Sequence, residues 1–295
     1  MALAVASTST ASTNNANNVV VTKPSGVQAG DLLLIAVPGL GGAAASCTGF
    51  TVAINEFADF PGGLQDLSMT LLYRIADSSD VSATNYTVDP GISSVDSGAV
   101  VMMRVTGWTS GNPVFASQRD TGSQDATSFT INPTGLNIPR PAGCLLLMLN
   151  VFGANNSPYS TATFSGYSVT SGVANPTWIE VLDTTFQTSS GPTGSFSLAY
   201  AITTSTTPIT AFSVTGATDA GGTDDTEMAL LLVICEPISP TPTVSHISTD
   251  PAVHAPTVTQ VNVAPTVSHH VSTAAVHAPE ALALRPTQWT PVEKT

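Results

Sequence analysis

The chain has 295 residues and a mass of 30.0 kDa, enough for one large or two small domains with a sizeable apolar core. Only 9% of its residues are Asp, Glu, Lys or Arg, and long amphipathic helices need a charged outer face, so we expect a fold without them. Nearly all of the net charge of −13 lies in residues 1–237, and the seven Lys and Arg residues are scattered singly, so we expect no direct binding of nucleic acid.

Short apolar segments, separated by clusters of Gly, Pro, Asn, Asp and Ser, follow a polar stretch at residues 1–16. Segments of this kind, without a helical period, are typical of strands in antiparallel sheets. In chain order they cover residues 31–37, 50–52, 71–75, 86–88 and 99–105, and then residues 144–151, 167–169, 198–202, 212–214 and 228–234. The pattern predicts two halves of five strands each.

The two halves are similar in residue order. VTKPSG at residues 21–26 matches IPRPAG at 138–143 with an offset of 117, and TGFTV at 48–52 matches SGYSV at 165–169 with the same offset. In both copies we expect the Gly to form a turn and the aromatic residue to begin a strand. The repeat predicts a duplicated fold.

The most apolar segments, residues 32–37 and 145–151, are too short to span a membrane and have no polar face, so we expect strands covered on both sides. We therefore predict an all-β fold, an antiparallel, jelly-roll-like double-sheet sandwich over residues 17–237. Its pseudo-repeated halves lie at about 17–130 and 131–237. Two separate small domains are the alternative.

This order of motifs resembles a family of β-sandwich proteins encoded among the structural genes of tailed bacteriophages and prophages. The motifs are VTKPSG, GDLLL, TGFTV, LLYR and YTV, followed by a second PAGCLLL round, and the likeness covers about residues 17–237. The family often has Trp where this chain has Phe50 and Tyr167. The resemblance implies a virion structural protein and carries over no catalytic residue.

Residues 238–295 differ from the rest in being rich in Pro, Thr, Val, Ala, Ser and His, and we expect an extended, irregular arm. Two blocks, residues 242–256 and 265–279, share ten of fifteen positions at an offset of 23, including PTVSH and AVHAP. A plain spacer is one interpretation of this composition. The recurring Val residues and the repeat favour a segment that docks onto partners, by strand addition or in a groove.

We expect the arm to bind the major capsid protein or other virion subunits. The side chains predicted to make that contact are Val and His residues of the two blocks and one Trp: Val244, His246, Val253, His254, Val267, His269, Val276, His277 and Trp289. The His residues lack the close spacing of a ligand pair, so we interpret them as the polar lining of a groove and predict no metal site.

Candidate catalytic groups are sparse in residues 1–237, because all five His residues lie in the arm. Glu180 and Asp183 form a carboxylate pair, Trp108 and Trp178 are potential sugar platforms, and the acidic stretch 219–227 offers ligands for Ca²⁺. None of them matches a known motif. We interpret the aromatic residues as core or rim and the acidic stretch as a turn, and predict a protein that is not an enzyme and has no cofactor.

The three Cys residues are far apart in the sequence, and Cys144 and Cys235 lie in apolar runs, where Cys behaves as a small hydrophobe. We therefore expect free, buried thiols and assembly in the reducing cytoplasm of a host cell. We expect no secretory signal and no contact with a membrane.

Together these patterns predict a structural protein of a bacteriophage virion that decorates or cements the capsid, or forms a head fibre, and is anchored by its arm. A tail or baseplate component is the second hypothesis. A receptor- or carbohydrate-binding adhesin is the third. We expect a homo-oligomer located in the virion.

Overall fold

The computed structural model describes residues 3–14, 18–60, 65–92, 97–108, 111–123, 128–131, 143–154, 161–170, 175–187, 193–203, 208–218, 225–235, 261–263 and 267–269. It divides the chain into two compact units, residues 1–237, called the body, and residues 238–295, called the arm. The described part of the body consists of antiparallel strands and one five-residue helix, which confirms the predicted all-β fold.

Within the described residues, the first half of the body has eight strands. They are β1 (Ala4–Asn14), β2 (Val19–Thr22), β3 (Leu32–Leu40), β4 (Ser46–Cys47), β5 (Thr51–Ala58), β6 (Leu67–Ile75), β7 (Asn85–Asp89) and β8 (Ser97–Thr106), and the helix α1 (Ser78–Ser82) precedes β7. One sheet has the order β1-β8-β3-β6-β5, and the other has the order β2-β7-β4.

The second half repeats this arrangement strand for strand. Its strands are β9 (Val114–Ser123), β10 (Ser128–Ile131), β11 (Leu145–Ala154), β12 (Ala162–Thr170), β13 (Ile179–Gln187), β14 (Thr193–Ile202), β15 (Ala211–Thr218) and β16 (Asp225–Cys235). Adding eight to each strand number of the first half gives the two sheets of the second half, β9-β16-β11-β14-β13 and β10-β15-β12. The predicted duplication is therefore confirmed.

Each half has the strand order of a jelly roll, with its strands 1, 8, 3 and 6 in one sheet and its strands 2, 7 and 4 in the other. The body thus contains four sheets among its described residues, where we expected one double sheet. The reason is that every ladder of hydrogen bonds stays within one half: β3 pairs with β6 and β8, and β11 pairs with β14 and β16.

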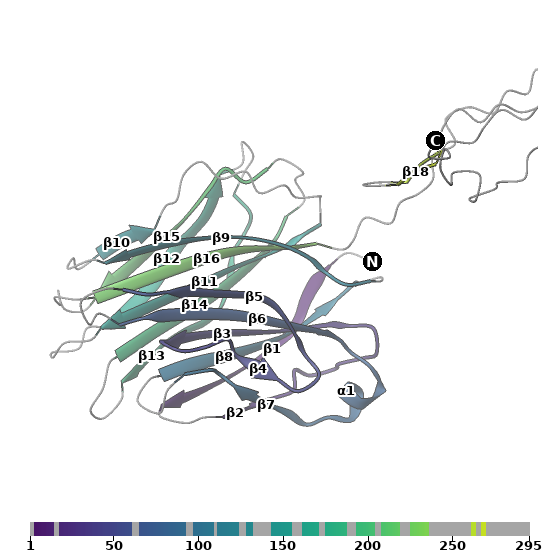
Figure 1. Ribbon diagram of the computed structural model, residues 1–295, viewed down its shortest axis with the longest axis horizontal. Helices are drawn as coiled ribbons and strands as arrows, with labels where there is room; N and C mark the ends of the chain where they lie inside the picture. The colour runs from purple at the N-terminus through teal and green to yellow at the C-terminus, as the bar shows by residue number, and fades with distance from the viewer. Residues whose placement is uncertain are drawn as a thin grey trace, which may run out of the picture. The chain divides into compact units, whose positions relative to one another are not determined.

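The four sheets form successive layers, with the purple to blue strands of the first half on one side and the teal to green strands of the second half on the other (Figure 1). Three apolar cores separate the layers. The central core lies between the two five-stranded sheets and takes residues from both halves, whereas each outer core lies between the two sheets of a single half. The halves are therefore joined by an apolar layer.

The central strand of each half explains why its sequence is apolar without interruption. Successive side chains of a strand point to opposite faces, so Leu32 and Leu34 of β3 enter the central core while Leu33 and Ile35 enter the outer core. In β11, Leu147 and Met148 alternate in the same way between two cores. The expectation that these strands are covered on both faces is confirmed.

Close approach of the halves depends on two glycines that face each other across β11 and β14. Gly153 pairs with Gly194 in the ladder. A Cβ atom added at Gly194 would lie 2.7 Å from the Ser97 hydroxyl of the first half, and one added at Gly153 would lie 3.1 Å from a methyl group of Leu67. Thr226 also donates a 2.8 Å hydrogen bond across the interface to the carbonyl of Gln65.

Two of the predicted boundaries differ from those in the structure. Residues 4–14 were expected to lie outside the sandwich, but they form β1, which pairs with β8 along its whole length. The division near residue 130 is also wrong, because β9 and β10 belong to the sheets of the second half. The division falls instead between Thr106 and Val114. Strands β1 and β9 are rich in Ser, Thr or charged residues, so their sequences lack the apolar signal of inner strands.

The SGYSV motif does not mark the same structural position as TGFTV. Gly49 has φ +82° and lies between β4 and β5, so Phe50 precedes a new strand as predicted. Gly166 has φ +65° but lies at a bulge within β12, so Tyr167 belongs to the same strand and the prediction is wrong there. In the second half, Trp178 is the aromatic residue that immediately precedes β13.

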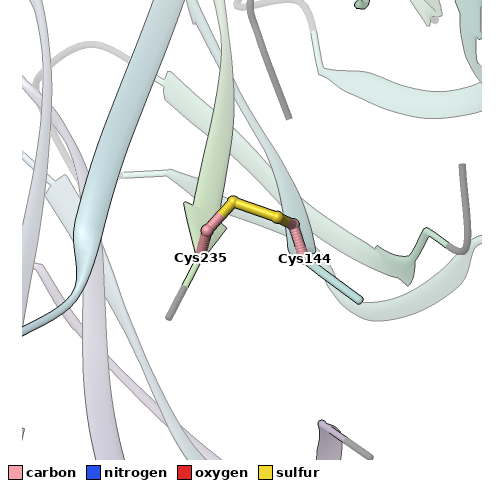
Figure 2. Close-up of a disulfide and its surroundings, with 2 residues drawn as sticks. All are labelled: Cys144 and Cys235. Carbon is pink, nitrogen blue, oxygen red and sulfur yellow. A yellow bond between two sulfur atoms is a disulfide. The ribbon is translucent and has the colours of Figure 1, made fainter. Parts of the chain in front are cut away.

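Cys144 and Cys235 form a disulfide bond, which corrects the expectation of free thiols. Leu145 pairs with Ile234, so one step further along the ladder Cys144 and Cys235 stand opposite each other, with Cα atoms 4.7 Å apart. Figure 2 shows the bond joining the end of β16 to the start of β11. Cys47 remains a free, buried thiol, and its burial raises its pKa to about 11.

The arm was expected to be irregular, but its described residues form two short paired strands. Strand β17 (Val261–Val263) pairs with β18 (Val267–His269) in antiparallel fashion. The second strand lies inside the second repeated block, so part of the repeat has extended backbone that pairs with another strand.

Candidate functional site

A group of aromatic and acidic side chains gathers at one edge of the second half. Tyr167 comes from β12, Glu180 and Asp183 come from the edge strand β13, and Asn175 and Trp178 come from the segment that leads into β13. We call these five residues the β13 edge cluster. The sequence singled out Glu180 and Asp183 as a carboxylate pair and Trp178 as a separate candidate, and the structure places all three next to Tyr167.

Hydrogen bonds hold the aromatic part of the cluster in place. Trp178 Nε1 donates to Asn175 Oδ1 at 3.2 Å, and the same oxygen accepts from the backbone N–H of Val169 at 3.0 Å. Asn175 Nδ2 in turn donates to the carbonyl of Tyr167 at 3.2 Å. The Tyr167 and Trp178 rings lie 6.1 Å apart between centroids and are tilted by 35°. The indole is thus fixed by a side-chain bond and a ring contact.

A polar row connects the cluster to the interior of the second half. The Tyr167 hydroxyl lies 3.1 Å from both Glu180 Oε1 and Ser197 Oγ. Ser197 is fully buried and also accepts a 2.8 Å hydrogen bond from Nδ2 of the buried Asn150. The carboxylate of Asp183 accepts a hydrogen bond from the backbone N–H of Phe164 at 3.4 Å.

Both carboxylates of the cluster have raised pKa values, although both residues are exposed at the surface. Partial burial is the main cause in each case, and the negative charge of Asp183 adds to the effect on Glu180. Burial likewise raises the pKa of Tyr167, so its hydroxyl stays protonated at neutral pH. The cluster therefore offers carboxylate acceptors beside a fixed aromatic pair.

The first half has no such cluster at the equivalent positions. Counted along the matching ladders, Val52 of β5 stands where Glu180 stands in β13, and Asn55 stands where Asp183 stands. Asn55 accepts a 2.8 Å hydrogen bond from Thr70, which occupies the position of Ser197. The first half forms the same fold without the two carboxylates, so the fold does not require them.

The first half has a different polar group, centred on Arg74. Its guanidinium contacts the carboxylates of Asp77 at 2.8 Å and Asp80 at 2.9 Å, and Asp80 also accepts from the Tyr86 hydroxyl at 2.9 Å. Asp77 caps α1, and its bonds to Ser79 lower its pKa. A shallow hollow of about 450 Å³ opens beside Arg74, but the charged groups there are paired with one another, so we interpret this group as structural.

Two of the nine arm residues predicted to bind partners lie among the described residues. Val267 and His269 are the first and last residues of β18, where Val267 pairs with Val263 and His269 pairs with Val261. The other seven lie outside the described residues: Val244, His246, Val253, His254, Val276, His277 and Trp289.

The remaining candidates of the sequence are separated by the fold. Trp108 is 9% exposed in the central core and donates to the carbonyl of Gly111 at 3.0 Å, so it shares no surface with Trp178. Residues 219–224 of the acidic stretch lie outside the described residues, and Asp225 begins β16. Among the described residues no group of three metal-ligating side chains occurs, and no helix is long and apolar enough to cross a membrane.

No family model matches the chain, and no curated protein matches it. Among solved structures, a chain named BspA_C_WT is 10% identical, with a TM-score of 0.18 over 78% of this chain and 87% of that one. The C-terminal domain of the AgI/II polypeptide BspA of Streptococcus agalactiae is also 10% identical, with a TM-score of 0.16 over 76% and 84%. At these TM-scores the similarity supports no statement about fold or function.

Proposed function

We propose that this chain is a structural protein of a bacteriophage or prophage virion, anchored to the particle by its arm. The observation that carries the proposal is that, among the described residues, strands of the body itself line all three apolar cores, from which we infer that residues 238–295 are not needed to complete the fold. The arm, which contains an internal repeat and a paired extended segment, is then available to bind another subunit.

The expected partners are the major capsid protein or other virion subunits. We prefer a role on the head of the particle, as a capsid decoration protein or a head fibre. A body with few charged residues of mostly acidic sign keeps many copies soluble and apart on a particle surface. A tail or baseplate location uses the same separation of body and arm. We also propose that the chain assembles as a homo-oligomer, has no catalytic activity, and makes no direct contact with nucleic acid.

Deletion of residues 238–295 tests the attachment. We expect the truncated body to keep the melting temperature of the full chain and to be missing from purified particles. Changing Val244, Val253, Val267 and Val276 together to Ser is expected to weaken incorporation strongly, since each buried Val contributes about 1.5 kcal/mol. As the matched control, His246, His254, His269 and His277 are changed to Gln, with a smaller expected effect. Normal incorporation of the truncated chain would contradict the proposal.

A second candidate function, a carbohydrate-binding adhesin, is favoured by the β13 edge cluster. Sugar rings pack their C–H faces on aromatic side chains, and their hydroxyls donate to carboxylates and amides. Trp178, Glu180 and Asn175 offer these groups at one edge. The carboxylates also lower stability at neutral pH, because their pKa values are raised, and the first half forms the same fold without them.

Binding of the full chain to a glycan array tests this second function. We expect a hit whose affinity is lost when Trp178 is changed to Ala and reduced when Glu180 is changed to Gln. Val52→Ala is the matched control, because Val52 holds the position of Glu180 in the first half, and it is expected to leave binding unchanged. Absence of any glycan bound above background would exclude the adhesin.

A further inference from the structure

The disulfide lies where the chain leaves the body for the arm. Cys235 is the last residue of β16, and the arm begins at Ile238. Strand β16 is hydrogen-bonded on both sides, to β11 and to β9, and its last residue pairs with Val114. Cys144 immediately precedes β11, so the bond fastens the exit point to the central strand of the sheet (Figure 2).

The first half lacks this link at the equivalent position. Its ladder pairs Leu32 with Val105, and one step further Asp31 and Thr106 stand where Cys144 and Cys235 stand in the second half. Asp31 makes an ion pair of 2.6 Å with Arg104 instead. The chain that leaves this end of β8 leads directly to β9, which the second half holds in its own sheet. The duplicated fold therefore does not itself require a covalent link here.

We propose that the Cys144–Cys235 disulfide is a mechanical clamp that passes tension on the arm to the centre of the body. This inference rests on the proposed attachment through the arm, because only an anchored arm is under tension. In this role the bond holds the end of β16 against a pull applied at residue 236 and beyond. This is distinct from a general stabilisation of the folded state.

The direction of the pull explains why a covalent bond is needed at this position. A load on the arm acts first on the last residue of β16, so the ladder bonds of Cys235 and Ile234 carry it before any others do. Hydrogen bonds loaded one at a time from a strand end break in sequence. With the disulfide in place the load also reaches β11, whose side chains are buried in both the central and an outer core.

Single-molecule pulling on the full chain tests the clamp in two geometries that share one handle at residue 187, at the end of β13. In the first, the second handle is at residue 295, so the load enters through the arm. In the second, it is at residue 123, at the end of β9, so the arm is not loaded. The bond is removed either with a reductant or by Cys144→Ala with Cys235→Ala.

With the bond intact, we expect the arm-loaded protein to hold until the whole second half unfolds. Without it, we expect an early step at lower force of up to about 40 Å, the extended length of the eleven residues of β16, and a several-fold shorter lifetime under constant load. The geometry that does not load the arm is expected to show no early step in either state.

A matched variant places the link in the wrong half. Asp31→Cys with Thr106→Cys, added to the two Ala substitutions, is expected to leave the early step in place. The clamp is refuted if the early step is absent without the Cys144–Cys235 bond, or if removing the bond shortens the lifetime equally in both geometries. The second result would assign the bond general stabilisation only. These measurements use the isolated chain, so they stand or fall independently of incorporation into particles.

Discussion

The two halves of the body share one strand order but differ in the groups that link and decorate the strands. At the same end of the sheet, an ion pair between Arg104 and Asp31 in the first half is replaced by a disulfide in the second. At the edge strands, Val52 and Asn55 are replaced by Glu180 and Asp183. The apolar pattern common to both halves determines the fold. The positions that differ are free of that constraint, and function is best sought among them.

Separating the halves should have the largest effect, because each contributes one wall of the central core. We expect fragments 1–112 and 113–237 to be unfolded or aggregated when produced alone, and to form a soluble complex when produced together. Circular dichroism and size-exclusion chromatography measure both outcomes. Two fragments that each unfold cooperatively would show that the central core is only a contact between independent domains.

Removing the disulfide should destabilise the second half by a large amount. The bond joins residues separated by 91 positions, and constraining a loop of that size in the unfolded chain contributes about 4.5 kcal/mol by the chain-entropy estimate. Denaturant unfolding with and without reductant measures the loss. Asp31→Asn serves as the comparison, because Asp31 holds the position of Cys144 in the first half. It should lower the free energy of unfolding by less. An unchanged midpoint in reductant would show that the thiols are not paired.

Adding a side chain at Gly194, one of the two facing glycines, should weaken the contact between the halves. A Cβ atom at Gly194 would lie 2.5 Å from the ring of Phe196 and 2.7 Å from Ser97 Oγ, so Gly194→Ala overpacks the interface. Changes of this kind cost roughly 1–3 kcal/mol, which thermal unfolding measures. Gly30→Ala is a poor control because Gly30 has φ +93°. Ser165→Ala, at an exposed position, should be nearly neutral.

Neutralising the edge carboxylates should change the free energy of unfolding least. Unlike the changes above, it should increase stability at neutral pH. Their pKa values are raised by burial, so the folded state binds protons more tightly than the unfolded chain does. The protonated carboxyl groups therefore contribute stability that is complete below about pH 4. This contribution is lost as the pH rises through the folded-state pKa values. Glu180→Gln with Asp183→Asn should raise stability at pH 7 by less than about 1 kcal/mol, because solvent screens exposed groups.

The advantage of this double variant should disappear at about pH 3, where the natural carboxyl groups are protonated in both states. Urea unfolding at the two pH values tests the sign. The pair Val52→Ala and Asn55→Ala at the equivalent edge of the first half should show no such dependence on pH. Lower stability of the double variant at pH 7 would mean that the carboxylates make favourable interactions beyond those described.

The sequence alone predicts the inner strands well, because β3 and β11 alternate between two cores and must be apolar at every position. It does not show that each half pairs only with itself, since apolar runs do not specify which partner they choose. The outer strands β1 and β9 were missed because their polar residues resemble a linker.

The disulfide could have been predicted from the sequence, whereas the edge cluster could have been predicted only in part. Once the long apolar strands of the second half are paired, Leu145 opposite Ile234 brings Cys144 and Cys235 together, but the inference requires the register. The cluster depends on Tyr167 lying within β12 and Trp178 lying just before β13. The offset of 117 placed Tyr167 at the start of a strand, so the sequence concealed the contact between the two rings.

Quantitative mass spectrometry of purified phage particles tests the central proposal most directly, when the chain is counted relative to the major capsid protein. If the chain decorates the shell through its arm, many copies should accompany each head, and none should remain when residues 238–295 are deleted. A few copies at one site would place it in the tail. Particles that contain no copies of the full chain would contradict the account.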